Sequence, residues 1–130
     1  MPFMPPYPRQ IRTRDDAHRL FAGLGRGRQE AIGVAFLGRE RTILGLRHAW
    51  GRNDSVAVPF ARIARDALLL AARAVLIAHN HPDGDTRPSA ADLALTRRLS
   101  QGLAALDVVL LDHLIVTGAG IISLHEQGLL

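Results

Sequence analysis

Apolar and polar residues follow one another along the chain in alternating helical and strand-like patterns. Apolar positions recur at helical spacing in three segments and form short strand-like runs between them. The helical segments are 15–24, 60–72 and 89–106. The strand-like segments are 30–37, 42–50, 56–58, 74–78, 108–111, 113–116 and 121–124. This order predicts a mixed central β-sheet flanked by helices, in the α/β or α+β class.

Turn-forming residues separate the predicted elements and indicate where the chain reverses. Residues 38–41 form a polar turn short enough to join strands 30–37 and 42–50 as a hairpin. Pro59 suits the first turn of the second helix. Residues 79–88 lie between a buried strand and the third helix and are dense in turn formers, which predicts a loop.

The N-terminal segment differs in composition from the rest of the chain. Residues 1–14 contain four prolines and show no periodicity, which predicts an extended arm. Residues 1–28 hold six arginines and two aspartates, whereas residues 29–130 hold ten arginines and ten acidic residues. The length of 130 residues fits one domain. We therefore expect a basic arm with a short helix over 1–28 and one folded domain over 29–130.

The charge of the arm has two explanations. An arginine-rich segment could contact nucleic acid or an acidic partner. A solvated leader that confers solubility explains the same composition equally well.

Side-chain usage excludes several kinds of chemistry. The chain has no cysteine, which excludes disulfides, cysteine zinc ligands and cysteine nucleophiles. All 16 basic residues are arginine, so lysine Schiff bases and lysine-dependent phosphate-binding loops are excluded as well. Any metal must therefore be held by histidine and carboxylate side chains.

The sequence gives no indication of a membrane protein. No apolar run reaches the roughly 18 residues that span a bilayer. The N-terminus also lacks the basic start and apolar stretch of a secretion signal. We therefore expect a cytoplasmic protein.

The stretch with the most chemical information begins at His79 and ends at Asp92. Two histidines at i and i+2 on an extended segment point to the same side, so His79 and His81 can bind one ion. After a loop over residues 82–88, Asp92 lies in the first turn of the next helix and can add a carboxylate. Two histidines, one carboxylate and a water form a known catalytic zinc arrangement, in which the fourth position stays open.

Each part of this group also has a simpler structural explanation. A single histidine at a strand end is usually a surface residue or a hydrogen-bonded one. Ser89 and Asp92 fit a helix start, with serine as the N-cap and a carboxylate three residues later. The joint occurrence of both features favours the metal site. Ser89 could cap the helix through its backbone while its hydroxyl faces the metal.

These residues match the pattern His-x-His-Pro-x6-Ser-x2-Asp, and the chain therefore resembles the JAB/MPN family, whose metal signature is called the JAMM motif. The RadC-like branch of that family is the most similar. The matching segments are His79–Thr96, Leu110–Val116 and Ser123–Leu130. The resemblance covers about residues 29–130 and implies a cytidine-deaminase-like architecture.

The resemblance implies a hydrolase that uses a metal-activated water. Its zinc ion would be held by His79, His81 and Asp92. A glutamate on the first core strand, here Glu30, would be the general acid/base, and Ser89 would help to stabilise the oxyanion.

Other polar residues are weaker candidates for a role in the site. Glu40 and Glu126 lie in a turn and in the tail. Asp112 and His113 could orient the imidazoles, but a salt bridge or a turn role at the strand end is favoured for them. Asn80 stands where peptidase branches of the family have serine or threonine, as is normal for the RadC-like branch.

Three functions are compatible with this sequence. The resemblance favours a zinc metallopeptidase or isopeptidase that takes a peptide or protein substrate. The first alternative is a module associated with DNA repair, in which the metal is structural and the arginine-rich arm binds nucleic acid. The second is a metal-dependent nuclease. The absence of net charge in residues 29–130 favours the peptidase.

Overall fold

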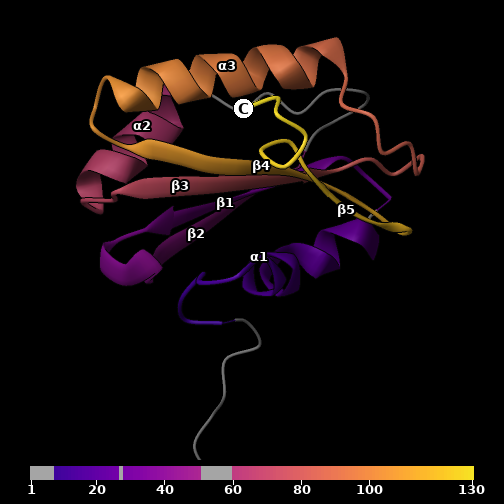
Figure 1. Ribbon diagram of the computed structural model, residues 1–130, viewed down its shortest axis with the longest axis horizontal. Coiled ribbons are helices and arrows are strands. Elements are labelled where there is room, and N and C mark those ends of the chain that lie inside the picture. The colour runs from indigo at the N-terminus through magenta and orange to yellow at the C-terminus, as the bar shows by residue number, and fades with distance from the viewer. Residues whose placement is uncertain (1–7, 27, 51–59) are drawn as a thin grey trace, which may run out of the picture.

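The computed structural model describes residues 8–26, 28–50 and 60–130, which form a five-stranded sheet with helices on both faces (Figure 1). The strands are β1 Ala31–Leu37, β2 Ile43–Trp50, β3 Ala74–Asn80, β4 Val109–Thr117 and β5 Gly120–Ser123. The helices are α1 Arg14–Phe21, α2 Phe60–Leu69 and α3 Ala90–Ala104, with short 3-10 helices η1 Ala22–Arg26 and η2 Arg39–Arg41. The strand order is β2-β1-β3-β4-β5.

The sheet is mixed because one of its pairings follows a helical crossover. β1 is antiparallel to both β2 and β3, and β4 is antiparallel to β5. β3 and β4 are parallel, and α3 connects them across one face of the sheet. This connection places the start of α3 close to the C-terminal end of β3.

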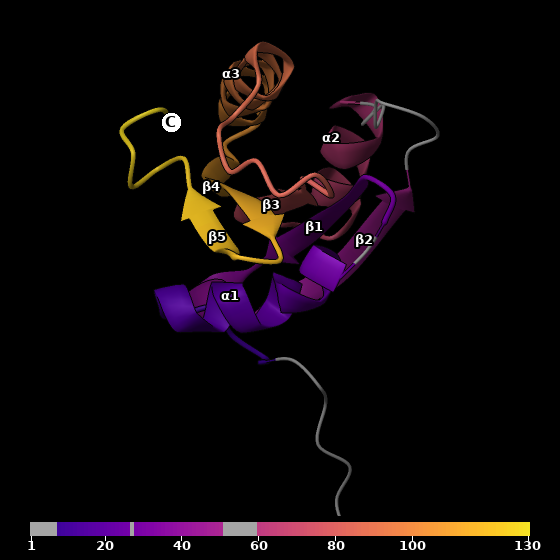
Figure 2. The same ribbon diagram turned by 90° about the vertical axis from the view of Figure 1, so that its right-hand side faces the viewer.

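The sheet is buried between two apolar layers. Helices α2 and α3 cover one face, and α1 covers the other (Figure 2). The layer under α2 and α3 includes Val34, Phe36, Ile63, Val75, Ile77, Leu99 and Leu103. The layer above α1 includes Ile11, Phe21, Leu37, Leu76, Ala78, Leu114 and Val116.

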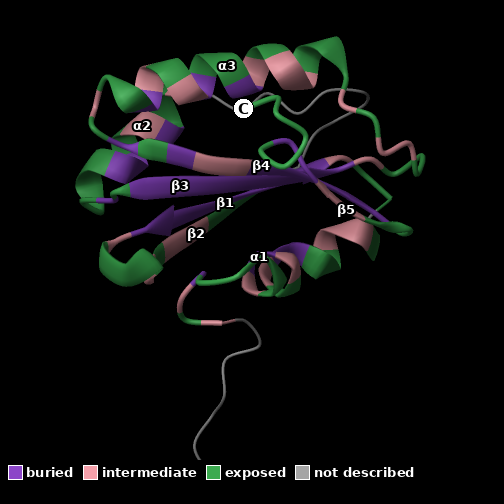
Figure 3. Cartoon of the chain, viewed as in Figure 1, coloured by how far each residue is buried: buried purple, intermediate pink, exposed green. Residues whose placement is uncertain are grey.

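Strand β3 is buried along its whole length and divides its side chains between the two layers (Figure 3). Val75 and Ile77 belong to the layer under α2 and α3, and Leu76 belongs to the layer above α1. Because side chains alternate along a strand, His79 continues the first row and Asn80 continues the second. The end of β3 therefore places one polar side chain on each face of the sheet.

The predicted fold class, a mixed sheet with helices packed on it, is confirmed. The sequence prediction of two strands over 108–111 and 113–116 is wrong, because one continuous strand, β4, covers this region. The pairing of β3 with β4 shifts register between Val75 and Leu76, which face Leu110 and Asp112. The two predicted strands meet at this irregularity.

A second boundary also differs from the prediction. β3 continues through His79 and Asn80, which the sequence placed in a loop, because His79 pairs with β1 and Asn80 pairs with β4. The predicted strand 56–58 and residues 1–7 of the predicted arm lie outside the described residues.

Helix α1 packs as part of the second apolar layer. Ala17 and Phe21 are buried, and so is Ile11 ahead of the helix. The Phe21 ring lies directly on Gly33 of β1, where an added Cβ would approach the ring to 2.6 Å. The division of the chain at residue 28 stays a prediction. Among the residues that the structure describes, no helix is long and apolar enough to cross a membrane.

Replacing Phe21 by alanine should lower the free energy of unfolding by about 3–5 kcal/mol, because the ring contacts are lost and a cavity remains against Gly33. Urea denaturation followed by circular dichroism measures this change. The matched control is Arg19→Ala on the exposed side of the same helix, which should change the value by less than about 0.5 kcal/mol. Equal effects of the two variants would show that α1 is not part of the cooperative core.

Candidate metal centre

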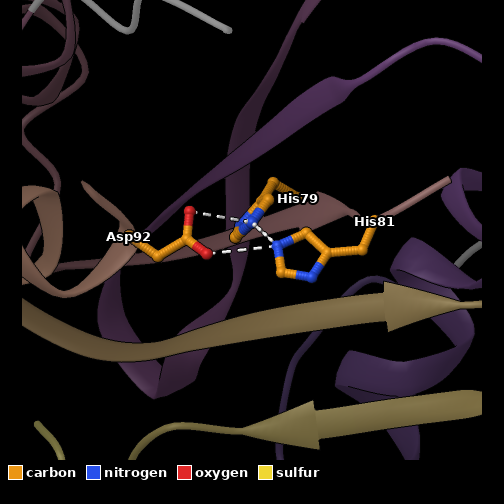
Figure 4. A group of neighbouring side chains, drawn as sticks. All are labelled: His79, His81 and Asp92. Atoms are coloured by element: carbon orange, nitrogen blue, oxygen red, sulfur yellow. Dashed lines mark hydrogen bonds and ion pairs between the residues drawn. The ribbon is translucent and has the colours of Figure 1, made fainter. Parts of the chain in front are cut away.

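The end of β3 and the first turn of α3 bring three ligand-type side chains together (Figure 4). The Nε2 atoms of His79 and His81 are 2.8 Å apart. Asp92 approaches both rings, with Oδ1 at 3.1 Å from His79 Nε2 and Oδ2 at 3.1 Å from His81 Nε2. These three side chains could hold a metal ion.

The Nδ1 atom of each histidine is engaged on the side away from this group. His81 Nδ1 lies 2.6 Å from the carbonyl oxygen of Asp85. A carbonyl can only accept, so His81 carries a proton on Nδ1, and in its neutral form the ring has a lone pair on Nε2. His79 Nδ1 lies 2.7 Å from Nε2 of His113, a buried histidine on β4.

A threonine hydroxyl settles the direction of the contact between these two rings. Thr96 Oγ1 donates to the main-chain carbonyl of Asp92 at 2.8 Å. Its single hydrogen is then used, so it accepts from His113 Nδ1 at 2.6 Å. The Nε2 atom of His113 is therefore an acceptor, and His79 donates to it from Nδ1. In its neutral form His79 is thus left with a lone pair on Nε2.

His113 is held in its neutral form. Burial is the main cause that lowers the pKa of His113 from 6.5 to about 3, and a positive charge on His79, when that ring is protonated, acts in the same direction. A neutral ring can accept the His79 proton and donate to Thr96 at the same time. The orientation of His79 thus depends on a residue of a neighbouring strand.

This arrangement needs a positive charge at its centre. Two nitrogen lone pairs 2.8 Å apart and a carboxylate 3.1 Å from each repel one another unless a shared proton or a metal ion lies between them. Ligands of a tetrahedral zinc ion, at about 2.0–2.1 Å from the metal, are about 3.3 Å from one another. The observed spacings of 2.8 and 3.1 Å are shorter than this, and the nitrogen and oxygen donor set fits such an ion.

Asp92 belongs to the N-terminal capping box of α3 and is also one of the three candidate metal ligands. Its Oδ2 accepts from the N–H of Ser89 at 2.7 Å, and the Ser89 hydroxyl accepts from the N–H of Asp92 at 3.0 Å, which completes a capping box. Burial alone would raise the pKa of the Asp92 carboxyl. Hydrogen bonds from a protonated His79 ring and from the Ser89 N–H outweigh burial and hold this pKa well below its usual range, so the carboxylate is ionised at neutral pH.

An open cavity of about 910 Å³ lies beside the three side chains. His81 and Asp92 line it, and so do Glu30 and Ser89. Glu30 immediately precedes β1, and Ser89 is the N-cap of α3. The hydroxyl of Ser89, and not only its backbone, caps the helix, but as an acceptor in that bond it keeps its hydrogen for a second partner.

The structure thus brings all five candidate residues from the sequence to one place. His79 lies deepest, and the other four line the cavity. The two weaker candidates for the base, Glu40 and Glu126, lie in η2 and in the C-terminal turn, and neither lines this cavity.

The sequence prediction underrated His113 and gave no role to Thr96. The favoured salt-bridge or turn role holds for Asp112, whose carboxylate accepts from the Ser123 hydroxyl and from the N–H of His125 at 3.0 Å. It is wrong for His113, which orients His79. Thr96 lies four residues after Asp92 on the same helix face, which is the sequence signal that could have pointed to it.

The fold and the site define an α/β domain with a candidate two-histidine, one-carboxylate metal centre. The family model of the RadC-like JAB domain matches residues 11–129. The chain therefore belongs to the RadC-like JAB domain family.

Curated relatives agree with this assignment. A UPF0758 protein of Acidithiobacillus ferrooxidans is 44% identical over 101 residues, which cover 77% of this chain and 45% of the relative. A UPF0758 protein of Marinobacter nauticus is 38% identical over 122 residues, 92% of this chain and 54% of the relative. One of Halorhodospira halophila is 42% identical over 102 residues, 78% of this chain and 46% of the relative. The chain spans about half the length of these relatives.

Replacing Thr96 by valine should weaken zinc binding by about 10–100-fold, because the acceptor that fixes the tautomer of His113 is lost. Competition with a chromogenic chelator measures the zinc affinity. The control is Thr117→Val on β4, where a buried hydroxyl donates to the carbonyl of Gly120 and does not touch the three side chains. The predicted role fails if both variants bind zinc as tightly as the unmodified protein.

The metal-free protein should lose stability as the pH falls from about 6.5 toward 3. His113 has a pKa of about 3 when folded and 6.5 as its usual value, so the unfolded chain binds one more proton in this interval. This residue contributes a slope of about 1.4 kcal/mol per pH unit, and its cost to stability disappears above pH 6.5. The low pKa of Asp92 acts in the same direction, but only below about pH 4.

Urea denaturation of the metal-free protein at a series of pH values measures this slope. The variant His113→Gln should reduce it by about one proton between pH 4.5 and 6.5. The control His125→Gln, at an exposed histidine, should leave it unchanged. A slope that His113→Gln does not alter would contradict the assignment of a neutral His113.

Proposed function

We propose that this domain is a zinc-dependent hydrolase that cleaves an amide bond in a peptide or an isopeptide. The observation that carries the proposal is the convergence of His79, His81 and Asp92 beside a cavity whose wall includes His81, Asp92 and Glu30. Three protein ligands with open space beside them are typical of catalytic zinc sites, whereas structural sites are closed by four.

The donor set supports zinc as the metal. Imidazole nitrogen and carboxylate oxygen are common zinc ligands, and the Nε2 lone pairs of His79 and His81 already point at one location. A zinc ion bound there would supply Lewis-acid activation of a water near neutral pH.

The residues around the cavity have the chemistry that amide hydrolysis requires. Glu30 would accept a proton from the attacking water and deliver it to the leaving amine. The hydroxyl of Ser89 would donate to the oxyanion that develops on the scissile carbonyl. Both residues belong to segments that the sheet and α3 fix, Glu30 before β1 and Ser89 at the helix cap.

The charge of the cavity favours a peptide over nucleic acid as substrate. Four carboxylates line it, from Glu30, Asp83, Asp85 and Asp92, against the arginines Arg28 and Arg87. Arg87 is already paired with Asp85, at 3.1 Å from Nε and 2.9 Å from Nη2. A bound zinc ion would bring the net charge of these side chains only to zero, so the cavity offers a polyanion no net attraction.

The N-terminal arginines offer nucleic acid a different surface. Four of the N-terminal arginines, 9, 12, 14 and 19, lie in and before α1, on the face of the sheet opposite α3. The second candidate function is a nucleic-acid-binding module that uses these arginines and in which the metal is only structural. We also propose that the domain acts in the cytoplasm, and that the longer relatives take a substrate of the same class.

Glu30→Gln should reduce hydrolysis by at least about 100-fold, because the amide cannot accept the proton of the attacking water. The same variant should bind zinc within about threefold of the unmodified protein, since Glu30 is not among the ligands. Zinc-loaded protein is assayed on peptide libraries, ubiquitin-like fusions and nucleic acids, with Glu126→Gln as the matched control.

Metal-dependent cleavage of a peptide or isopeptide that Glu30→Gln abolishes and Glu126→Gln retains would support the proposal. Equal activity of Glu30→Gln and the unmodified protein would refute the role of Glu30. Cleavage confined to nucleic acid would replace the peptidase by a nuclease.

A further inference from the structure

Asn80 separates the two histidines in sequence and lies on the other side of the sheet. The alternation along β3 directs His79 toward α3 and Asn80 toward the layer above α1. The side chain is 1% exposed. Its hydrogen bonds go to Ala31, Leu24 and Gln29 and not to the metal group, so its burial needs another explanation.

The amide of Asn80 is hydrogen-bonded to two segments that are distant in sequence. Oδ1 accepts from the N–H of Ala31 at 2.7 Å. Nδ2 donates to the carbonyl of Gln29 at 2.9 Å and to the carbonyl of Leu24 at 3.0 Å. Both amide hydrogens and the amide oxygen are therefore used.

These bonds bracket one residue. Gln29 and Ala31 are the neighbours of Glu30, so one side chain holds the backbone on both sides of the proposed base. The third bond, to Leu24, ties the same amide to η1, from which the chain leads to Glu30. Glu30 itself lines the cavity beside His81 and Asp92.

We propose that Asn80 is a positioning residue that sets the place of Glu30 relative to the metal group. His79 lies in β3 and His81 follows directly after the strand, so the residue between them fixes the base against both of these candidate ligands. This inference rests on the proposed function, in which Glu30 handles protons.

Asparagine is the side chain that fits this task. Aspartate would keep the acceptor for Ala31 but would turn a second oxygen toward the carbonyls of Leu24 and Gln29. Serine has one hydrogen and a shorter reach, so it could not span three backbone groups. The residue type therefore follows from the need for one acceptor and two donors in a buried place.

The first test uses the unmodified protein and nuclear magnetic resonance. The two side-chain hydrogens of Asn80 should exchange with water at least about 100-fold more slowly than those of an exposed amide such as Gln127. They should also show magnetisation transfer to the backbone amide of Glu30. Rapid exchange and no transfer would overturn the proposal without any variant.

The second test reads the carboxyl group of Glu30 directly. The chain has three glutamates, 30, 40 and 126, so carboxyl-13C glutamate labelling gives three signals, and Glu30→Gln identifies one of them. Addition of zinc to the metal-free protein should move the Glu30 signal and leave the other two in place.

In Asn80→Ser the zinc-induced movement of the Glu30 signal should fall to less than about half, while zinc affinity stays within about threefold. Where a substrate is in hand, kcat should fall by about 10–100-fold with KM little changed. Val75→Ala, a buried truncation on the same strand, is the control for lost stability, and it should leave the Glu30 response intact.

The outcomes separate the two proposals. A full Glu30 response in folded Asn80→Ser would overturn the role of Asn80 and leave the hydrolase proposal standing. No response to zinc in the unmodified protein would refute Glu30 as the base and the positioning role with it. If Asn80→Ser does not fold, the exchange measurement on the unmodified protein decides the question.

Discussion

The site is organised by the repulsion between two imidazole lone pairs and a carboxylate held about one hydrogen-bond length apart. Such a group is stable only around a positive charge, and the surrounding residues keep its nitrogens free of other partners. The carbonyl of Asp85 accepts a hydrogen bond from Nδ1 of His81, and Nε2 of His113 accepts one from Nδ1 of His79. The preference for a cation is therefore built into the hydrogen bonds behind the rings.

The same backbone alternation that gives the sheet two apolar layers gives the site its two halves. On one side of β3, His79 extends the row of Val75 and Ile77 toward α3. On the other side, Asn80 extends the row of Leu76 toward α1 and the segment before β1. One short strand thus carries the candidate ligand His79 on one face and, on the other, an asparagine that holds the backbone on both sides of Glu30.

Much of this arrangement could be predicted from the sequence because it depends on local spacing. The i, i+2 histidines and the helix-start aspartate are a few residues apart, and the order of elements follows from short apolar periods. What escaped prediction depends on pairing between distant segments. His113 reaches His79 because β3 and β4 are parallel in a shifted register, and the partners of Asn80 lie about fifty residues earlier in the chain.

The double use of Asp92 bears on how related sequences are interpreted. Its carboxylate completes the capping box of α3 through Ser89, whether or not a cation is present. An aspartate at this place can therefore be retained by helix stability alone and is a weak marker of metal binding. His81, whose ring is engaged by one loop carbonyl and otherwise serves the ligand group, has no such second use. In a homologue that keeps the aspartate and has lost this histidine, the helix would persist after the ion had become dispensable.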